Sequence, residues 1–207
     1  MLNPNSVIKK DKDYYSRGRT WPLLFDIKKG SAVLDVGCGT GLLGILLKDE
    51  FECNVTGLEI VEKNYSVAKK VLSRALLGDV EAMAFPIEGF MFDYVIFSDS
   101  LEHLVNPDLV LDKVLKQLNP GGRLLISMPN VRNFRVTFPL IFRGSWEYQE
   151  EGLLDKTHLR FFTKSSLVKL LESQGLVVTK IYYDLPLLSK VGWLNILTLG
   201  LFRNHLT

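Results

Sequence analysis

The stretch "VLDVGCGTGLLG" (residues 33–44) decides the fold, and its glycines fit two registers. From Gly39 onward it is Gly-x-Gly-x-x-Gly, the glycine pattern of a dinucleotide site. From Asp35 onward it is an acidic residue followed by three alternating glycines, Gly37, Gly39 and Gly41. Both registers need a tight turn, because glycine accepts a positive φ and lets a ligand approach the backbone closely. The first register indicates a nicotinamide or flavin enzyme, and the second indicates a different adenosine-bearing cofactor.

Around this stretch, short apolar runs alternate with amphipathic segments. The apolar runs predict six strands, at 32–36, 54–60, 74–79, 92–100, 123–129 and 176–186. The amphipathic segments predict helices at 42–51, 62–72, 107–118 and 163–175. The alternation predicts an α/β fold, with a Rossmann-like, doubly wound, mostly parallel sheet flanked by helices. Ligands of such sheets bind beyond the carboxyl ends of the strands, so functional residues should follow the strands directly.

Length and composition favour a single enzyme-sized domain. The chain has 207 residues, of which 47% are hydrophobic, and its formal net charge of +2 is too small to predict nucleic-acid binding. The N-terminus has basic residues with no apolar segment behind them, so no secretory signal is expected. Cys38 and Cys53 form no CxxC pair and the three histidines are scattered, so no metal site is expected. We therefore expect a cytoplasmic protein in a reducing compartment.

Two acidic residues bear on the choice of register. Glu59 ends the second strand, where a carboxylate can accept both hydroxyls of an adenosine ribose, and this suits either register. Asp35 discriminates, because a carboxylate beside the glycine turn opposes a pyrophosphate but suits a ligand that carries an ammonium group. The alternative for Asp35 is a buried acid that caps the neighbouring turn.

Asp79 is the third acidic residue that follows a predicted strand. At this place it can accept a hydrogen bond from an adenine amine, or it can simply be a turn residue after Gly78. The adenine contact is favoured over the turn role because Asp35, Glu59 and Asp79 follow three successive strands. The second register is therefore favoured.

With these residues assembled, the chain resembles the class I S-adenosylmethionine-dependent methyltransferases from about residue 14 to 184. The stretches that carry the resemblance are "VLDVGCGTG", "GLEI", "GD" at 78–79, "FDYVIFSDSLEHLVNP" and "LNPGGRLLISMPN". The resemblance implies S-adenosylmethionine as cofactor and S-adenosylhomocysteine as product. It implies cofactor contacts from Asp35, Gly37, Cys38, Gly39, Gly41, Glu59, Ile60, Asp79, Val80, Phe97 and Ser98.

Within this class, residues 152–176 resemble small-molecule methyltransferases of the ubiquinone-biosynthesis-like and glycan-linked groups. The family sheet ends in an antiparallel seventh strand, whereas this chain has the apolar stretch "LLSKVGWLNILTLGLFRNHLT" at its end. We expect this tail to be helical or irregular and the seventh strand to be missing or altered. Core packing or a homodimer contact is favoured for residues 191–202, and contact with a membrane surface is the alternative.

Two histidines are candidate general bases. His103 lies just beyond the fourth strand, and His158 lies in "DKTHLRFF". Histidine titrates near neutrality, which suits removal of a proton from a hydroxyl or phenol acceptor. The alternatives are a packing role for His103 at a helix start and an anchoring role for His158 through Asp155 or Thr157.

The segment 130–152 is too long for an ordinary connection and is typical of a lid or binding loop. Its arginines and aromatic residues predict an acceptor pocket, and the alternative is a short apolar helix that covers the sheet edge. The candidate acceptor-binding residues are Tyr15, Arg132, Arg135 and Trp146.

The predicted organisation is a single methyltransferase domain in four parts. These are an N-terminal cap (1–30), a cofactor-binding core (31–129), an acceptor-side insertion (130–162) and a C-terminal helix, strand and tail (163–207). The predicted function is methyl transfer to a small-molecule or biosynthetic-intermediate acceptor, at oxygen. The alternatives are a nicotinamide-dependent oxidoreductase and a non-catalytic binding subunit that keeps the cofactor fold.

Overall fold

A computed structural model describes residues 24, 26–82, 87–182 and 205–206. Five parallel strands form the sheet: β1 (Ala32–Val36), β2 (Asn54–Glu59), β3 (Arg74–Leu77), β4 (Phe92–Ser98) and β5 (Leu118–Pro129). The strand order is β3-β2-β1-β4-β5-β6, where β6 (His205–Leu206) pairs antiparallel with β5. The order reverses direction between β1 and β4, which is the switch point of a doubly wound sheet.

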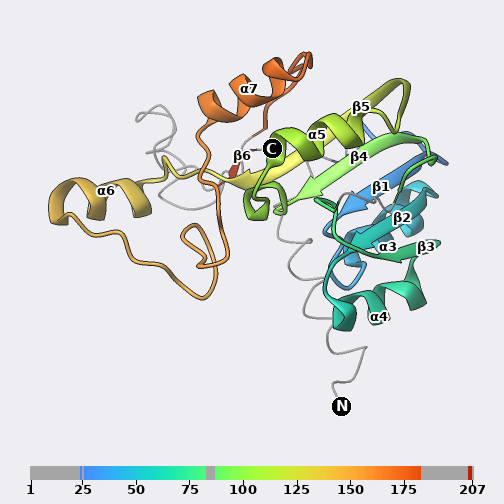
Figure 1. Cartoon of the computed structure of the whole chain (residues 1–207), viewed down its shortest axis with the longest axis horizontal. Coiled ribbons are helices and arrows are strands. Elements are labelled where there is room, and N and C mark those ends of the chain that lie inside the picture. Colours follow the sequence, from blue (N-terminus) through green and yellow to red (C-terminus); the bar gives the residue numbers. More distant parts are fainter. Residues whose placement is uncertain (1–23, 25, 83–86, 183–204, 207) are drawn as a thin grey trace.

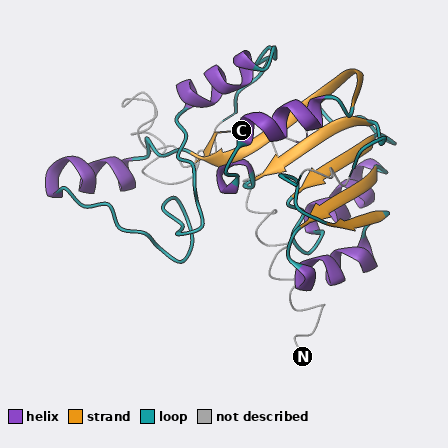
Figure 2. Cartoon of the chain, viewed as in Figure 1, coloured by secondary structure: helices purple, strands orange, loops and turns teal. Residues whose placement is uncertain are grey.

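Helices cover both faces of this sheet, as Figures 1 and 2 show. α3 (Leu42–Phe51) and α4 (Glu62–Val71) lie on one face, and α5 (Pro107–Leu115) and α7 (Lys164–Ser173) lie on the other. Along the central strands, successive side chains enter two different cores. Val33, Tyr94 and Ile96 pack with residues of α3, whereas Leu34, Val95 and Phe97 pack with residues of α5. This alternation is the period of two that places side chains on opposite faces of a strand.

Glycine permits the close packing of β2 against the start of α3. A Cβ on Gly57 would lie 2.5 Å from both Cys38 Sγ and Leu72 Cδ1, and a Cβ on Gly44 would lie 2.2 Å from Leu72 Cδ2. Separations below 3 Å cannot be accommodated without movement of a neighbour. Gly57 therefore lets the glycine loop lie close to β2, and Gly44 lets α3 lie close to Leu72.

The first five predicted strands are confirmed; three of them end one or two residues earlier than predicted, and the start of the fifth differs most. The sequence predicts that "NPGG" (119–122) is a break between helix and strand, yet these residues belong to β5, which begins at Leu118. The pairing between β4 and β5 shifts register between Phe92 and Tyr94, and this irregularity accommodates the glycines within the strand.

The prediction of a sixth strand at 176–186 is wrong for its described part, because residues 176–182 form neither helix nor strand. Residues 183–186 lie outside the described part of the chain. The tail does supply a strand, since His205–Leu206 pairs with Met128 and Pro129 of β5. The β-branched and aromatic residues at 176–182 do not decide whether a neighbouring strand edge is available for pairing, which is a tertiary property.

The long connection after β5 lies at the carboxyl edge of the sheet. α6 (Phe134–Arg143) extends away from the sheet on the side toward which β5 points, as Figure 1 shows. α6 thus does not cover the sheet edge, which was the alternative considered for this segment. Among the described residues, no helix has the length and apolar character needed to span a membrane.

Candidate functional site

The backbone N–H groups of the glycine loop after β1 donate hydrogen bonds to other groups of the protein. The N–H groups of Gly37 and Cys38 donate to the Leu58 carbonyl at 2.8 and 3.1 Å, and that of Gly41 donates to Cys38 at 2.9 Å. The Gly39 N–H donates to Glu59 Oε2 at 2.8 Å. A dinucleotide loop needs bare N–H groups to hold a pyrophosphate. With these four donors already paired, the loop favours the register that starts at Asp35.

Glu59 links the glycine loop to the start of α4. Its side chain is buried, and Oε1 accepts a hydrogen bond from Val61 N–H at 2.8 Å while Oε2 accepts the one from Gly39. A carboxylate oxygen has lone pairs for more than one donor. The carboxylate therefore holds the loop in shape and keeps acceptor capacity for hydroxyl groups of a ligand.

Asp35 is the most unusual residue of this half of the site. It is 2% exposed, and its Oδ2 has no hydrogen-bond partner within the described part of the chain. Burial, together with the nearby Glu59 charge, raises the pKa of Asp35 to about 7. A buried carboxyl without a partner costs stability. Such a group is typical of a binding site in which the ligand supplies the missing hydrogen-bond donor or cation.

The residues beside the loop have the chemistry that S-adenosylmethionine, the cofactor that the resemblance implies, requires. Gly39 has a φ of +55°, and a Cβ built on it would meet no atom within 4 Å, so open space lies beside the loop. The unpartnered oxygen of Asp35 suits an ammonium group, and Glu59 suits ribose hydroxyls. Asp35 and Glu59 thus provide complementary chemistry at one edge of the sheet.

The other predicted cofactor residues differ in exposure. Asp79 is exposed and its Oδ1 accepts a hydrogen bond from Glu81 N–H at 2.8 Å, so it forms the turn that is the alternative to an adenine contact. Ile60 is 63% exposed, whereas Val80 is buried. Phe97 is fully buried in the α5-side core and Ser98 is half-buried. Cys38 is buried in the core on the α3 side of the sheet, and this burial raises the pKa of its thiol.

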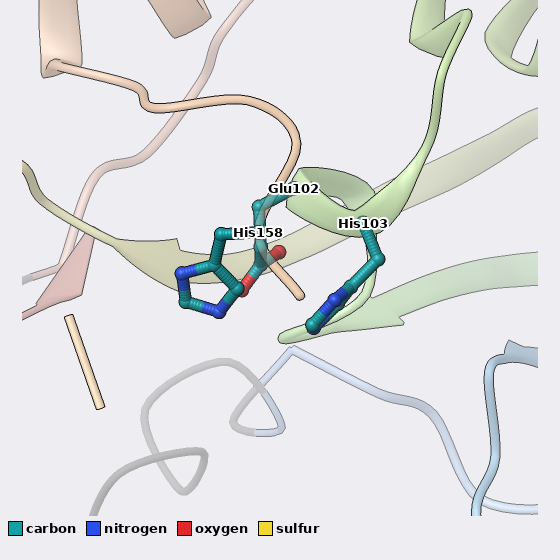
Figure 3. Close-up of side chains that lie close together, drawn as sticks. All are labelled: Glu102, His103 and His158. Carbon is teal, nitrogen blue, oxygen red and sulfur yellow. The ribbon is translucent and has the colours of Figure 1, made fainter. Parts of the chain in front are cut away.

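A second cluster lies at the end of β4 and joins three side chains. Glu102 and His103 come from the short 3₁₀ helix η1 (Leu101–His103), and His158 comes from the long segment after α6. Figure 3 shows the Glu102 carboxylate between the two imidazole rings. The ring centroids of His103 and His158 are 4.8 Å apart, and His158 Nε2 lies 3.9 Å from Glu102 Oε1. The structure therefore brings both predicted catalytic histidines together.

Hydrogen bonds hold the segment that carries His158 against η1. The Glu102 carbonyl accepts from the N–H groups of both Leu159 and Arg160 at 3.0 Å. His103 Nδ1 lies 3.1 Å from the Thr157 carbonyl oxygen. Because a carbonyl only accepts, Nδ1 must carry the hydrogen, and the neutral ring then has its lone pair on Nε2. The segment around His158 is thus held against η1 by three hydrogen bonds.

The electrostatics of the cluster follow from burial. Burial raises the pKa of Glu102 to about 8, and repulsion from Asp99 and Asp155 adds to the shift. Burial also lowers the pKa of His158, with a further contribution from His103, while a hydrogen bond to the Leu153 backbone opposes the shift. Both Glu102 oxygens lack a hydrogen-bond partner among the described residues. At neutral pH burial therefore favours the uncharged forms of both Glu102 and His158.

Asp99 immediately precedes this cluster and has a strained backbone. Its φ is +50°, a left-handed conformation that is uncommon for residues other than glycine. Its N–H donates to the Ser127 carbonyl of β5 at 2.9 Å. Such strain concentrates at functional sites, because the surrounding structure must maintain it. Here it turns the chain sharply from β4 into η1.

The predicted acceptor-binding residues divide into two groups. Trp146 reaches the cluster through Phe161, whose ring lies 5.1 Å from that of Trp146 and 6.2 Å from that of His158. Arg132 and Arg135 are exposed at the start of α6, apart from this aromatic contact. Tyr15 lies outside the described residues.

Sequence reasoning missed three functional or supporting residues. Glu102 stands beside His103 in "SLEHL", and a carboxylate next to a candidate base was the available signal. Phe161 has no signal in the sequence, and its ring contacts with Trp146 and His158 place it beside the cluster. Glu81 accepts hydrogen bonds from the N–H groups of Val105 and Asn106 and so holds the start of α5, a contact with no local signal.

Comparisons with known proteins agree on one family. The family model described as "Methyltransferase domain" matches residues 11–181. A demethylmenaquinone methyltransferase of Listeria monocytogenes is 34% identical over 190 residues, which cover 83% of this chain and 80% of the relative. The Listeria welshimeri enzyme of the same name is 30% identical over 190 residues, with the same coverage.

Solved structures share the fold at lower identity. The protein bound to the Trm112 methyltransferase activator in a Haloferax volcanii complex has a TM-score of 0.69 and is 14% identical, over 97% of this chain and 92% of that one. A Bacillus halodurans protein assigned as a methyltransferase has a TM-score of 0.60 and is 23% identical, over 78% of this chain and 70% of that one. Both similarities concern the arrangement of the sheet and its helices.

Proposed function

The chain belongs to the methyltransferase domain family and is an S-adenosylmethionine-dependent methyltransferase of small molecules, and we propose that its acceptor atom is the oxygen of a ring-bearing hydroxyl compound. The observation that carries this proposal is the cluster of Glu102, His103 and His158 at the carboxyl end of β4. A hydroxyl must lose its proton to become a good nucleophile, and this cluster provides a group for that task.

The cofactor half of the site is proposed on the residues described above. Asp35 would hold the ammonium group, Glu59 the ribose hydroxyls, and the loop Gly37–Gly41 the methionine part. Asp79 and Val80, with Ile60, Phe97 and Ser98 nearby in the fold, would border the rest. When bound, S-adenosylmethionine supplies the electrophilic methyl carbon, and the protein contributes position and electrostatics.

His103 is the residue that we propose to take the proton. It is half-buried, so an acceptor can reach it, whereas His158 is 7% exposed. Its Nδ1 is engaged with the Thr157 carbonyl, which leaves the Nε2 lone pair for the acceptor hydroxyl. The proton moves to Nε2, the oxygen lone pair forms the bond to the methyl carbon, and the electron pair of the broken sulfur–carbon bond stays on sulfur.

The aromatic residues beside the cluster support an acceptor that has a ring. Trp146 and Tyr148 both contact the Phe161 ring, with centroid distances of 5.1 and 6.2 Å, and Phe161 adjoins His158. Flat apolar groups stack favourably on such side chains. The Listeria relatives are named for a quinone, demethylmenaquinone, which is a ring compound of this kind.

The test is a screen of phenols and quinols as acceptors, with S-adenosylhomocysteine release as the readout. Wild type and His103→Ala are compared, and the position of the transferred methyl is determined by NMR on isotopically labelled product. We expect an O-methyl product, and a rate that falls in the variant. Methyl transfer to carbon or nitrogen alone would overturn the proposal for oxygen and leave the family assignment untouched.

A further inference from the structure

We propose that Glu102, His103 and His158 bind one divalent transition-metal ion of the Zn²⁺ type, at the place where the acceptor hydroxyl is activated. The inference rests on the proposed function for the ion's catalytic task, but its binding can be tested without any acceptor. One ligand atom from each residue lies within 4.8 Å of the others. Zn²⁺ bonds of about 2.0–2.1 Å place tetrahedral donors roughly 3.3 Å apart, so adjustments of about 1–1.5 Å complete the site.

The first independent observation is the state of Glu102. Its side chain is 2% exposed, and neither carboxylate oxygen has a hydrogen-bond partner in the described part of the chain. Figure 3 shows this carboxylate directed into the space between the two imidazoles. Buried carboxylates are normally paired or coordinate a metal. A cation at this point would satisfy an oxygen that the protein leaves without a donor.

The second observation is the orientation of the histidines. His103 uses Nδ1 for the Thr157 carbonyl, so its Nε2 lone pair is available for an ion. His158 turns its Nε2 toward Glu102 at 3.9 Å, and the Leu153 backbone lies close enough to act on the pKa of its ring. Metal-binding histidines characteristically donate their other ring N–H to a backbone carbonyl or carboxylate, which fixes the ring and the tautomer. His103 has such a partner in the Thr157 carbonyl.

The donor set also determines which ion fits. Two imidazoles and one carboxylate make up the protein ligands of several catalytic zinc sites, which keep a fourth position open. Mg²⁺ prefers oxygen ligands and gives up its waters reluctantly, so it fits poorly here. The carboxylates of Asp99 and Asp155 lie near enough to act electrostatically on Glu102, and they add negative charge that a divalent cation offsets.

The open position gives the ion its task. A coordinated hydroxyl loses its proton more readily, because the positive charge stabilises the oxyanion. The proton leaves to solvent, the oxygen attacks the methyl carbon, and the electron pair of the sulfur–carbon bond stays on the sulfur. With the ion bound, His103 would be a metal ligand, and the ion would activate the acceptor hydroxyl. In the metal-free protein, the His103 imidazole would activate it as a base.

The experiment is calorimetric titration of Zn²⁺ into the full chain after treatment with a chelator, beside a titration of Mg²⁺. The variants are Glu102→Gln, His103→Ala and His158→Gln, and the matched control is Glu172→Gln on the exposed face of α7. We expect one Zn²⁺ per wild-type chain, no saturable Mg²⁺ binding, and at least about 100-fold weaker Zn²⁺ binding in each cluster variant, since even outer-shell changes cost about 10–100-fold. The control should bind as wild type.

The inference would be overturned if wild type bound no stoichiometric Zn²⁺. It would also be overturned if all three cluster variants bound Zn²⁺ as tightly as wild type. Circular dichroism of each variant checks folding, and if His158→Gln does not fold, His103→Ala and Glu102→Gln decide. Zn²⁺ binding with the expected pattern but no O-methylated product would refute the oxygen acceptor alone. O-methylation that needs His103 in a protein that binds no Zn²⁺ would refute the metal site alone.

Discussion

The imidazole rings of His103 and His158 meet at a centroid distance of 4.8 Å and an interplanar angle of 70°, although they come from η1 and from the long segment beyond α6. This relationship exists because the chain between residues 157 and 160 hydrogen-bonds to η1. It places the proposed acceptor half of the site after β4, next to the glycine loop after the neighbouring strand β1, where the cofactor half is proposed. The following predictions test the two halves separately.

Replacing His103 with alanine should lower the rate of methyl transfer by about 100- to 10,000-fold, the usual contribution of a positioned acid or base. The affinity for S-adenosylhomocysteine should not change, because His103 belongs to the acceptor half. Steady-state kinetics and calorimetry measure the two quantities on one preparation. A variant with an undiminished rate would mean that proximity alone drives the reaction.

The affinity for S-adenosylhomocysteine should depend on pH through Asp35. Its pKa is about 7 without a ligand, and an ammonium group beside it should lower that value. Binding then releases a proton, so the affinity rises as the pH passes through 7, by about tenfold between pH 6 and pH 8. The Asp35→Asn variant should bind with an affinity that changes little over this range. Equal pH dependence in both proteins would place the ammonium group elsewhere.

Glu102 should make the folded protein less stable as the pH rises. Its pKa is raised from 4.5 to about 8, so the folded chain keeps a proton that the unfolded chain loses. This group's favourable contribution is complete below pH 4.5 and is lost as the pH rises to about 8. Between these values the slope is about 1.4 kcal/mol per pH unit.

Urea denaturation of wild type and Glu102→Gln at pH 5.5, 6.5 and 7.5 measures this slope. The variant should show a shallower decline of the unfolding free energy with pH, and it should be more stable than wild type at pH 7.5. Parallel curves for the two proteins would show that Glu102 is charged and paired in the folded state.

Two glycines should respond to alanine in opposite ways. Gly57→Ala places a methyl group against Cys38 and Leu72 and should lower the unfolding free energy by about 1–3 kcal/mol. Gly39→Ala meets no atom within 4 Å, so its cost should be limited to the positive φ, about 1 kcal/mol. The Gly39 variant should instead lose cofactor affinity, because its methyl enters the open space beside the loop. Calorimetry of binding, compared with thermal unfolding, separates the two effects.

Much of the fold was predictable because the signals are local. The strand that ends at Val36 is a buried apolar run, and the turn after it needs positive φ at Gly37, Gly39 and Gly41, which only glycine adopts at little cost. Asp35 and Glu59 lie near the carboxyl ends of β1 and β2, which are neighbours in the sheet, so the topology brings them together. The cytoplasmic location and the individual contact residues stay predictions.

The acceptor half was less predictable because its signals are tertiary. Both histidines were candidates, but nothing near His158 in the sequence indicates that it packs against Glu102. The scattered histidines predict no metal site, and this stays a prediction that the proposal above puts to the test; distance along the chain does not report distance in space. The strand predicted at 176–182 is wrong because strand formation there depends on which sheet edge is available for pairing.

The most direct test of the account is calorimetric binding of S-adenosylhomocysteine and NAD⁺ to wild type and to Glu59→Ala. We predict saturable binding of S-adenosylhomocysteine to wild type, weakened at least about tenfold in the variant by loss of the ribose contacts and of loop support, and no binding of NAD⁺. Binding of NAD⁺ alone, or S-adenosylhomocysteine binding that is unchanged in Glu59→Ala, would contradict the account.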